Sequence, residues 1–592
     1  MENEQPKRPH LNSFLLALIA VLVGVIGGFG AVAFRALIAF FHNLLFLGKL
    51  SLVYEANIHT SPSPWGPLVI LVPVLGAAGV SFLITRFAPE AKGHGVPEVM
   101  DAIYYNRGII RPVVAAVKSL ASGLSIGSGG SVGREGPIVQ IGASFGSTLG
   151  QYIPMATWQR ITLIAAGTGA GIAATFNTPI GGVLFAVEIM LNEVSVRTMV
   201  PVAIATATAT YIGQVFFGVY PAFVIPELQT PFFHLLNPLL IVSYFGVGII
   251  AGIGSAIYIH SIYFLEDIFD QKMPGNYYLR HMTGMLLVGV LMYLSMTFLG
   301  HYYIEGVGYA GIEDVLTGKL SAFWLLGLLF VLKLLVTALT LGSGASGGIF
   351  SPALFLGAMA GGAYGVALKA IFPFLPVSPP VFALAGMAGM VCGSTGAAIT
   401  ALVMVFEMTL DYNAVLLLTV TVAASNGIRA VLSRETIYTL KLARRGHFMP
   451  NALRTNFPSL KHAKSIMESP PAILPGSMPI EDFAKLVIQG DGSCFLVEDQ
   501  KSILGIVSGN DALKALDAPS GMTLGELVEK NYITVSEESP LFEIVRRMRA
   551  EEANTAIVVP KGKPLATGNV VGVLTKDRIA DLMEQNVASY DE

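Results

Sequence analysis

This chain contains a series of apolar runs long enough to cross a lipid bilayer. A membrane-spanning helix needs about 20 mostly apolar residues, and such runs recur along the first three quarters of the sequence. They lie at 13–47, 66–87, 158–191, 198–217, 236–264, 280–299, 321–341, 380–410 and 413–432. Charged residues make up only 13% of the chain, about half the ~25% usual in soluble domains. We therefore expect a multi-pass integral membrane protein embedded in a lipid bilayer.

Glycine interrupts many of these runs, which argues against a simple bundle of straight helices. The sequence holds 64 glycines, and shorter apolar stretches rich in glycine lie at 137–152 and 352–370. Irregular backbone survives at membrane depth only where protein buries it or where it lines a cavity. Broken helices therefore predict a transport path through the membrane part.

The character of the sequence changes after Tyr438, where charged helices and β-branched strands replace the apolar runs. The predicted divisions are an N-terminal segment (1–12), a membrane part (13–446, in halves of about 13–217 and 236–446), a linker (447–462), two soluble α/β repeats (463–520 and 521–586) and a C-terminal tail (587–592).

Basic residues flank both ends of the membrane part. Lys7 and Arg8 precede the first apolar run, and Arg444 and Arg445 close the last one. Positive charge beside a membrane span favours the cytosolic side, so we expect both termini in the cytosol. We assign the protein to the plasma (inner) membrane of a prokaryote.

The membrane part contains an internal repeat. Residues 127–137 read GSGGSVGREGP and residues 342–352 read GSGASGGIFSP, and each begins nine residues after a lysine, Lys118 or Lys333. Matching glycine-interrupted segments in two halves are the best sequence indication of a transporter's central site. The pattern alone leaves open whether the halves are parallel or inverted.

A second pair of positions supports the same repeat. Gly167 lies 21 residues before Glu188, and Gly386 lies 21 residues before Glu407. The tail repeats as well: IEDFAKLVIQ, CFLVE and GIVSGND correspond to LFEIVRRMRA, AIVVP and GVLTKD. Each tail unit is predicted to be helix, strand, strand, helix, and the two units are expected to pair.

Three loops of the membrane part share a design that suits an anion. They read GHGVP (93–97), GREGP (133–137) and GIFSP (348–352), and each leads into helix-forming sequence. Proline is favoured in the first helical turn, and glycine lets the backbone approach a ligand closely. Free N–H groups and the helix dipole then form an anion site. Three such helix starts predict a pathway for small inorganic anions.

With these motifs the chain resembles CLC chloride channels and chloride/proton antiporters that carry a C-terminal pair of CBS domains. The resemblance covers roughly 13–446 and 463–586 and rests on GREGP, GIFSP and the variant G-x-G-x-P loop GHGVP. It implies an all-α membrane fold with two inverted halves and broken helices. It also implies a homodimer with one chloride pathway per subunit.

The resemblance assigns roles to individual residues. Glu135 of GREGP corresponds to the gating glutamate, and Tyr438 to the tyrosine whose hydroxyl contacts the central anion. The alternatives are an ion pair between Glu135 and Arg134, and an interfacial anchor at Tyr438. The full predicted anion-binding set is His94, Gly95, Arg134, Gly136, Ile349, Phe350 and Tyr438.

Two positions depart from the family pattern. His94 stands where chloride-selective members usually have serine, and histidine could donate to an anion and make transport sensitive to pH. The alternative is a histidine that faces the cytosolic vestibule and has no role in selection. Ile189 stands where the antiporters have the internal proton-transfer glutamate, next to Glu188, which corresponds to a structural acid. The departure at His94 leaves the anion selectivity open, and the departure at Ile189 favours a channel or a loosely coupled exchanger. A proton route through Glu188, Glu193 or water stays open.

In the tail, the resemblance extends to adenine-nucleotide binding. Ser508 and Asp511 fit the CBS ribose-binding pattern of a hydroxyl followed by an acid three residues later. In the second repeat Arg578 takes the acid's place after Thr575, and Asp577 lies one position early. A nucleotide site and a purely dimerising scaffold both remain open.

Other classes of protein receive less support. No HExxH or Walker motif occurs, and GxSxG strings lie in glycine-rich membrane segments rather than in the strand–turn–helix context of a hydrolase. We therefore predict no enzymatic activity, no resident cofactor and no metal site. The net charge of −3 does not favour a nucleic-acid partner. A nucleotide sensor with a membrane anchor would leave Glu135 and the three loops unexplained.

Overall fold

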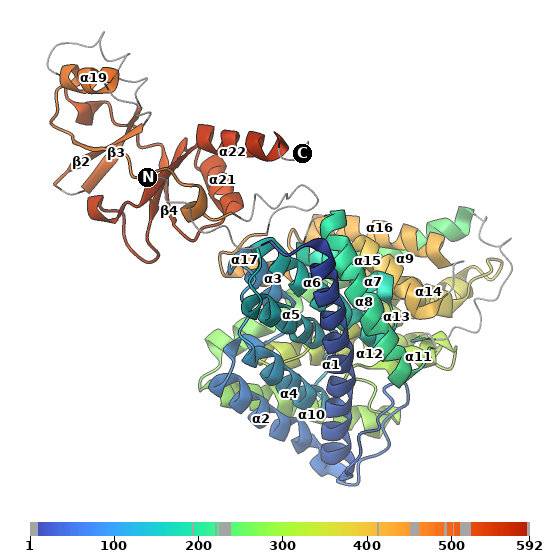
Figure 1. Cartoon of the computed structure of the whole chain (residues 1–592). Coiled ribbons are helices and arrows are strands. Elements are labelled where there is room, and N and C mark those ends of the chain that lie inside the picture. Colours follow the sequence, from blue (N-terminus) through green and yellow to red (C-terminus); the bar gives the residue numbers. More distant parts are fainter. Residues whose placement is uncertain are drawn as a thin grey trace. The chain divides into compact units, whose positions relative to one another are not determined.

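The chain forms two compact units, which divide between Met449 and Pro450 (Figure 1). The computed structural model describes residues 10–191, 194–219, 222–223, 238–410, 414–449, 461–489, 494–500, 502–508 and 522–588. The first unit is helical, and the second is a small α/β unit. The predicted fold class, an all-α membrane part with a C-terminal α/β part, is confirmed.

The first half of the helical unit has eight α-helices among the described residues. They are α1 (Ser13–Leu47), α2 (Val72–Arg86), α3 (Val96–Tyr104), α4 (Val113–Gly127), α5 (Glu135–Tyr152), α6 (Thr157–Phe176), α7 (Pro179–Phe185) and α8 (Val196–Phe217). Short turns of other helix types precede α2 (Gly66–Leu71) and α3 (Pro89–Ala91), and a π-helical segment (Ala186–Leu191) follows α7.

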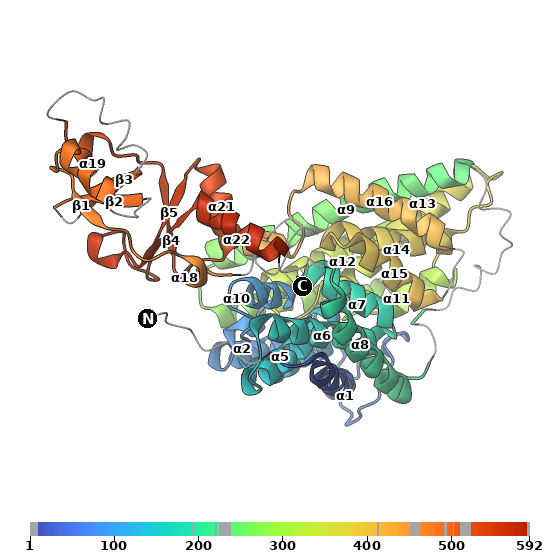
Figure 2. The same ribbon diagram turned by 45° about the horizontal axis from the view of Figure 1, so that its top comes forward.

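The second half repeats this order. Its described helices are α9 (Pro238–Asp267), α10 (Tyr277–Leu299), α11 (Tyr309–Leu316), α12 (Phe323–Gly342), α13 (Phe350–Ile371), α14 (Pro379–Thr395), α15 (Ala398–Thr409) and α16 (Val415–Leu432). A π-helical segment (Ile268–Lys272) extends α9, and α17 (Thr439–Arg444) closes the unit. In Figure 2, α9, α13, α14 and α16 of this half lie together, as α5, α6 and α8 of the first half do.

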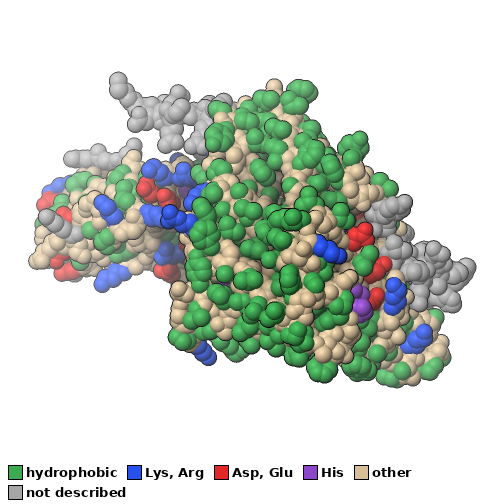
Figure 3. Space-filling model, turned by 90° about the horizontal axis from the view of Figure 1, so that it is seen from below, with side chains coloured by type: hydrophobic (Ala, Val, Ile, Leu, Met, Phe, Trp, Pro, Cys, Tyr) green, Lys and Arg blue, Asp and Glu red, His purple; other side chains and the backbone are tan. Residues whose placement is uncertain are grey.

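Eight helices in the described residues are long and apolar enough to cross a membrane. Large hydrophobic side chains are exposed on them, among them Phe14 on α1, Leu75 on α2 and Val242 on α9. Hydrophobic side chains cover most of the visible face of the helical unit in Figure 3. An outer surface of this kind matches lipid rather than water, so the prediction of a multi-pass membrane protein is confirmed.

Two apolar runs that look continuous in the sequence are broken. The run 158–191 divides at Asn177, which has a left-handed φ of 60° at the end of α6. The run 380–410 divides at Gly396, with a φ of 79° at the end of α14. A left-handed residue ends a helix because it turns the chain away from the helix axis, so α7 and α15 begin as separate short helices.

The two halves are inverted relative to each other. Lys92, in the segment that follows α2, forms an ion pair with Asp270 just beyond α9 (3.5 Å). Glu305, in the loop that follows α10, is bonded to His42 near the end of α1 (2.8 Å). α10 therefore begins beside the end of α9 and finishes beside the end of α1. The first helices of the two halves must run in opposite directions.

Glycines let the central helices touch along their backbones. A Cβ atom on Gly167 of α6 would lie 2.1 Å from the carbonyl oxygen of Gly142 on α5. In the other half, a Cβ atom on Gly386 of α14 would lie 2.2 Å from the carbonyl oxygen of Gly357 on α13. Small residues at a helix crossing permit this close approach in membranes. The repeat that Gly167 and Gly386 mark in the sequence is therefore a repeat of packing.

The second unit contains two α/β repeats. Their described elements are α18 (Ala463–Ile466), β1 (Ile473–Pro475), α19 (Ile480–Gln489), β2 (Cys494–Asp499) and β3 (Ser502–Ser508), then β4 (Tyr532–Ser536), α21 (Leu541–Ala550), β5 (Thr555–Val559), β6 (Gly572–Thr575) and α22 (Lys576–Ala588). Each repeat has a three-stranded sheet, ordered β1-β2-β3 and β4-β5-β6.

The strand pairing is the same in both sheets. β1 pairs parallel with β2, starting at Ile473 and Leu496, and β4 pairs parallel with β5, starting at Tyr532 and Thr555. The third strand is antiparallel to the second in each sheet. The sequence prediction identified the central helix and the two later strands of each repeat but missed the short first strands, β1 and β4.

Candidate anion pathway

The three glycine loops meet at the centre of the helical unit. Gly133 and Gly348 exchange two backbone hydrogen bonds of 2.7 and 2.6 Å, which joins the GREGP loop to the GIFSP loop. Gly93 donates to the carbonyl of Ala345 (3.0 Å) and accepts from Gly347 (3.3 Å), which joins the GHGVP loop to the same strand of chain. The starts of α3, α5 and α13 are therefore fixed side by side, as the sequence predicted.

Glu135 places its carboxylate at the start of α13. The side chain is 1% exposed. One carboxylate oxygen accepts hydrogen bonds from the hydroxyls of Tyr309 (2.7 Å) and Ser351, and the other accepts from the backbone N–H of Ser351 (3.3 Å). A backbone N–H at a helix start and two hydroxyls are donors that a small anion would also use. The carboxylate thus occupies a position suited to an anion.

The hydrogen-bond partners of Glu135 include two residues that the sequence prediction missed. Ser351 lies inside the quoted GIFSP motif and is the second residue of α13. Tyr309 is the first residue of α11, and its hydroxyl also contacts that of Ser351 (2.9 Å). The signal for Tyr309 is the sequence GVGY at 306–309, which repeats the G-x-G of GHGV at 93–96 in the other half.

Two lysines, each nine residues before one of the repeated glycine motifs, hold the loops that lead into α3 and α11. The ammonium group of Lys118 donates to the carbonyls of Ala91 (3.0 Å) and Gly93 (2.7 Å). The same pattern is centred on Lys333, which donates to the carbonyls of Ile304 (3.1 Å) and Gly306 (2.8 Å). Both lysine side chains are fully buried. Each lysine therefore fixes the approach to a short helix, α3 or α11.

Arg134 does not serve as the ion-pair partner of Glu135. Its guanidinium lies over the ring of Tyr309, 5.3 Å from the ring centre, and donates to the carbonyl of Thr175 (3.5 Å). The ion pairs found in the described part of the chain do not include Arg134 with Glu135. The cation instead adds positive charge beside the carboxylate's own binding groups.

His94 and Tyr438 face each other on another side of the same loops. Both are buried, with ring centres 5.9 Å apart. The hydroxyl of Tyr263 donates to the carbonyl of Ile437 (2.5 Å), next to Tyr438, and lies 3.4 Å from Nε2 of His94. The backbone of His94 also abuts the start of α5, because a Cβ atom on Gly136 would lie 2.2 Å from the His94 carbonyl oxygen.

The remaining predicted anion contacts lie at helix starts. Gly95 precedes α3 with a φ of 85°, a conformation that favours glycine. Ile349 and Phe350 are the last residue before α13 and its first residue, and the carbonyl of Ile349 accepts from the Tyr258 hydroxyl (3.1 Å). The structure thus gathers the predicted residues of all three loops around one region.

Glu188 caps a helix of the opposite half. Its carboxylate accepts from the backbone N–H groups of Ile399 (3.2 Å) and Thr400 (2.8 Å) and from the Thr400 hydroxyl (2.6 Å), at the start of α15. Ile189, its neighbour, is buried in the π-helical segment after α7. Glu193, the other acid considered for proton transfer, lies outside the described residues.

Glu407 makes the reciprocal contact. Its carboxylate accepts from the backbone N–H groups of Ile180 (3.0 Å) and Gly181 (2.6 Å), at the start of α7. An acid at the end of each half's short helix therefore caps the short helix of the other half. Negative charge at a helix start is stabilising because it meets unpaired N–H groups and the positive end of the helix dipole.

Replacing Glu188 with glutamine is expected to reduce stability without altering ion coupling. Glutamine keeps the shape but loses the charge, and a hydrogen bond to a charged group contributes about 1.5–3 kcal/mol. Thermal unfolding of detergent-solubilised protein should show a lower midpoint, while Glu90→Gln at a half-exposed ion pair should not. A changed ratio of protons to chloride in liposomes would instead identify Glu188 as a proton carrier.

In the tail, the structure describes only some of the predicted nucleotide residues. Ser508 ends β3, and Asp511 lies outside the described residues. The hydroxyl of Thr575 accepts from the backbone N–H of Arg578 (3.2 Å), so it caps α22, and Asp577 lies in the first turn of that helix.

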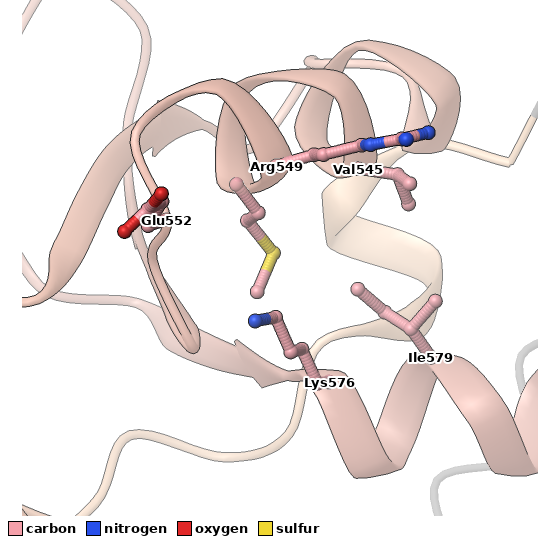
Figure 4. A pocket seen from close by; sticks show the side chains of 6 residues that line it. Val545, Arg549, Glu552, Lys576 and Ile579 are labelled. Atoms are coloured by element: carbon pink, nitrogen blue, oxygen red, sulfur yellow. The ribbon is translucent and has the colours of Figure 1, made fainter.

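A cavity of about 380 Å³ opens between α21 and α22 (Figure 4). Its lining residues are Val545, Met548, Arg549, Glu552, Lys576 and Ile579, which excludes the predicted Thr575 and Asp577. In the first α/β repeat, burial raises the pKa of the Cys494 thiol at the start of β2 to about 11, so the thiol stays protonated at neutral pH. The described residues contain no cluster of three metal-binding side chains.

Helix starts that converge on a buried carboxylate, within inverted membrane halves, define the class of anion-transporting membrane proteins. The sequence model of the family described as "Voltage gated chloride channel" matches residues 76–430, and that of the CBS domain matches 463–518 and 524–585. The chain therefore belongs to the voltage-gated chloride channel (CLC) family and carries two CBS domains.

Curated relatives support this assignment. The "H(+)/Cl(-) exchange transporter ClcA" of Yersinia pseudotuberculosis serotype IB (strain PB1/+) is 31% identical over 433 residues, covering 73% of this chain and 87% of the relative. The protein of the same name from Vibrio parahaemolyticus serotype O3:K6 (strain RIMD 2210633) is 32% identical over 445 residues, covering 73% and 90%.

Solved structures share the fold. A slow cyanobacterial Cl−/H+ antiporter aligns with a TM-score of 0.61 at 24% identity, covering 74% of this chain and 98% of that one. A eukaryotic CLC transporter aligns with a TM-score of 0.61 at 19% identity, covering 96% of this chain and 98% of that one. At these identities the likeness establishes the fold alone.

Proposed function

We propose that this CLC protein moves chloride across the membrane through a pathway that passes the His94–Tyr438 pair and Glu135. The single observation that carries the proposal is the Glu135 carboxylate, which accepts from the Ser351 N–H at the start of α13 (3.3 Å). An ionised carboxylate there competes with chloride for the same donors. Protonation removes the competing charge and frees the path, which makes Glu135 the gate.

The proton stoichiometry distinguishes two forms of this function. Ile189 occupies the place of the family's proton-transfer glutamate and favours a channel or a loosely coupled exchanger. The curated relatives are named H(+)/Cl(-) exchange transporters, which favours antiport by another proton route. Glu188 is a poor relay because both of its carboxylate oxygens accept hydrogen bonds from α15. We propose loose coupling as the form that fits both observations.

Simultaneous recording of chloride and protons in proteoliposomes tests the proposal. Purified full-length protein is reconstituted, a chloride gradient drives efflux, and the external pH is followed. Loose coupling predicts rapid chloride efflux with a small inward proton movement that disappears in Glu135→Gln. Efflux without proton movement indicates a channel, and a fixed ratio of inward protons to outward chloride indicates an antiporter. Absence of chloride flux would contradict chloride transport itself.

The homodimer, the cytosolic termini, the prokaryotic inner-membrane location and nucleotide binding by the CBS pair stay predictions. For the nucleotide, the Ser508 end of β3 is the described part of the first-repeat site. A nucleotide sensor whose membrane part serves only as an anchor would conduct no chloride, so the same liposome measurement separates it from a transporter.

A further inference from the structure

His94 carries a buried nitrogen without a hydrogen-bond partner. Its side chain is 3% exposed, and Nδ1 has no partner among the described residues. The residue belongs to the GHGVP loop that leads into α3, a helix of nine residues. A buried polar atom without a hydrogen-bond partner destabilises the folded protein by about 1–3 kcal/mol. A bound ligand that pairs with the atom would remove this cost. The predicted anion position beside Tyr438 supplies one.

The surrounding hydrogen bonds determine which nitrogen carries the hydrogen. The hydroxyl of Tyr263 is committed as a donor to the carbonyl of Ile437 (2.5 Å). The same hydroxyl oxygen lies 3.4 Å from Nε2 of His94, and it can only accept there. In the neutral ring Nε2 therefore bears the hydrogen, by assignment from the network, and Nδ1 presents a bare lone pair. A lone pair repels an anion.

Positive charges surround the buried ring. Burial and nearby like charges both disfavour a second proton on an imidazole, and the neighbouring cations are Lys441, Lys118 and Arg445. Glu98 is shared between Arg445 (2.7 Å) and Lys441 (3.4 Å), so its charge is already compensated. The charged and titratable groups of the elements around the ring are Glu98, Asp101 and Tyr104 of α3, Lys118 of α4, Glu135 and Tyr152 of α5, Tyr244, Tyr258, His260, Tyr263, Glu266 and Asp267 of α9, Tyr438 before α17, Lys441 and Arg444 of α17, and Arg445 directly after α17.

We infer that an anion bound between His94 and Tyr438 brings one proton with it, held on Nδ1 of His94. The proton comes from the aqueous phase, a new N–H bond forms at Nδ1, and the donor is left as its conjugate base. The former lone pair becomes a charged donor that the anion needs. The negative charge of the anion in turn offsets the repulsion between the surrounding cations and a protonated His94. By linkage, each raises the affinity for the other by the same factor.

This inference rests on the proposed anion pathway and extends it to proton coupling. It gives the pathway a titratable group in a chain whose inner position 189 is isoleucine. His94 reaches the start of α5 through the contact of its backbone with Gly136, adjacent to Glu135. Two titratable side chains, one on each side of these joined loops, then both respond to the anion.

Isothermal titration calorimetry with sodium chloride measures the proton directly. The full-length chain carries Glu135→Gln, so that Glu135 takes up no proton, and Glu135→Ala serves if the glutamine variant does not fold. Titrations at one pH in buffers of different ionisation enthalpy give a slope equal to the protons taken up. We expect a slope near one at alkaline pH, and chloride affinity that weakens about tenfold per pH unit.

Two matched variants separate the possible outcomes. His94→Ser, which offers a hydroxyl donor that does not titrate, should bind chloride with a slope of zero and no pH dependence. His260→Ser, at an exposed histidine of α9 bonded to the Ala256 carbonyl, should keep the slope of one. The inference is overturned if the Glu135→Gln chain binds chloride with a slope of zero, or if its slope of one persists after His94→Ser. Either result leaves the anion pathway intact. No chloride binding in any variant contradicts the pathway itself.

Discussion

Glu135→Gln in a His94→Ser background is expected to remove the pH dependence of chloride flux. In the unmodified protein the flux should rise as the external pH falls, because protonation of Glu135 withdraws a negative charge from donors that chloride needs. Hydrogen bonds to a charged group contribute about 1.5–3 kcal/mol, and 1.4 kcal/mol corresponds to a factor of ten. A neutral glutamine should therefore strengthen chloride binding at neutral pH about tenfold or more. Flux assays in liposomes across a pH series measure both effects.

The control for this experiment keeps the charge change but moves it off the pathway. Glu90→Gln breaks an ion pair with Arg111 (2.6 Å) whose side chains are 42% and 52% exposed, and it should leave the pH profile unchanged. A profile that still rises at low pH when Glu135→Gln and His94→Ser are combined would show that a different group controls the gate. Tyr309→Phe and Ser351→Ala each remove a donor that Glu135 and chloride share, so each should weaken chloride binding, in contrast to Glu135→Gln.

Replacing either buried lysine with methionine is expected to destabilise the protein strongly. Methionine fills a similar volume but leaves two buried carbonyl oxygens without a donor, at a cost of about 1–3 kcal/mol each. Lys118→Met should also weaken chloride binding, because Gly93 is adjacent to His94. Lys333→Met should instead alter the gate, because Gly306 leads into Tyr309. Thermal unfolding in detergent and chloride calorimetry measure the two effects separately.

An exposed lysine of the same unit provides the comparison. Lys369 lies in the last turn of α13 with an exposed side chain, so Lys369→Met should unfold and bind chloride as the unmodified protein does. If Lys118→Met and Lys333→Met matched that control, the two ammonium groups would not be holding the loops. If both lysine variants changed the Glu135 gate and the anion position between His94 and Tyr438 equally, the assignment of one lysine to each loop would be wrong.

The sequence was sufficient to predict the elements of the site that are local. GREGP, GIFSP and GHGVP each combine glycine with proline before a helix, so each helix start could be identified without knowing its neighbours. The position of Tyr309 depends on long-range packing: α11 is brought to Glu135 by Lys333 and by the pairing of Gly133 with Gly348. Only the weak G-x-G of residues 306–308 marked it.

Breaks inside apolar runs were harder to predict. Asn177 and Gly396 are single left-handed residues that end α6 and α14. The pattern of hydrophobic residues does not change at a single backbone angle, so it cannot predict these breaks. The contacts of Glu188 were predicted only as a structural role. Their partner, α15, lies more than 200 residues away in the chain, and no local pattern identifies so distant a helix start.

The reciprocal caps make the two halves interdependent as they fold. α7 lies in the first half but takes its terminal charge from Glu407, and α15 lies in the second half but takes its charge from Glu188. A ribosome that has released only the first half has produced a helix start whose cap does not yet exist. That half can insert into the membrane but cannot finish its own structure. The cap of α7 is thus completed only after α15, which carries Glu407, has been synthesised.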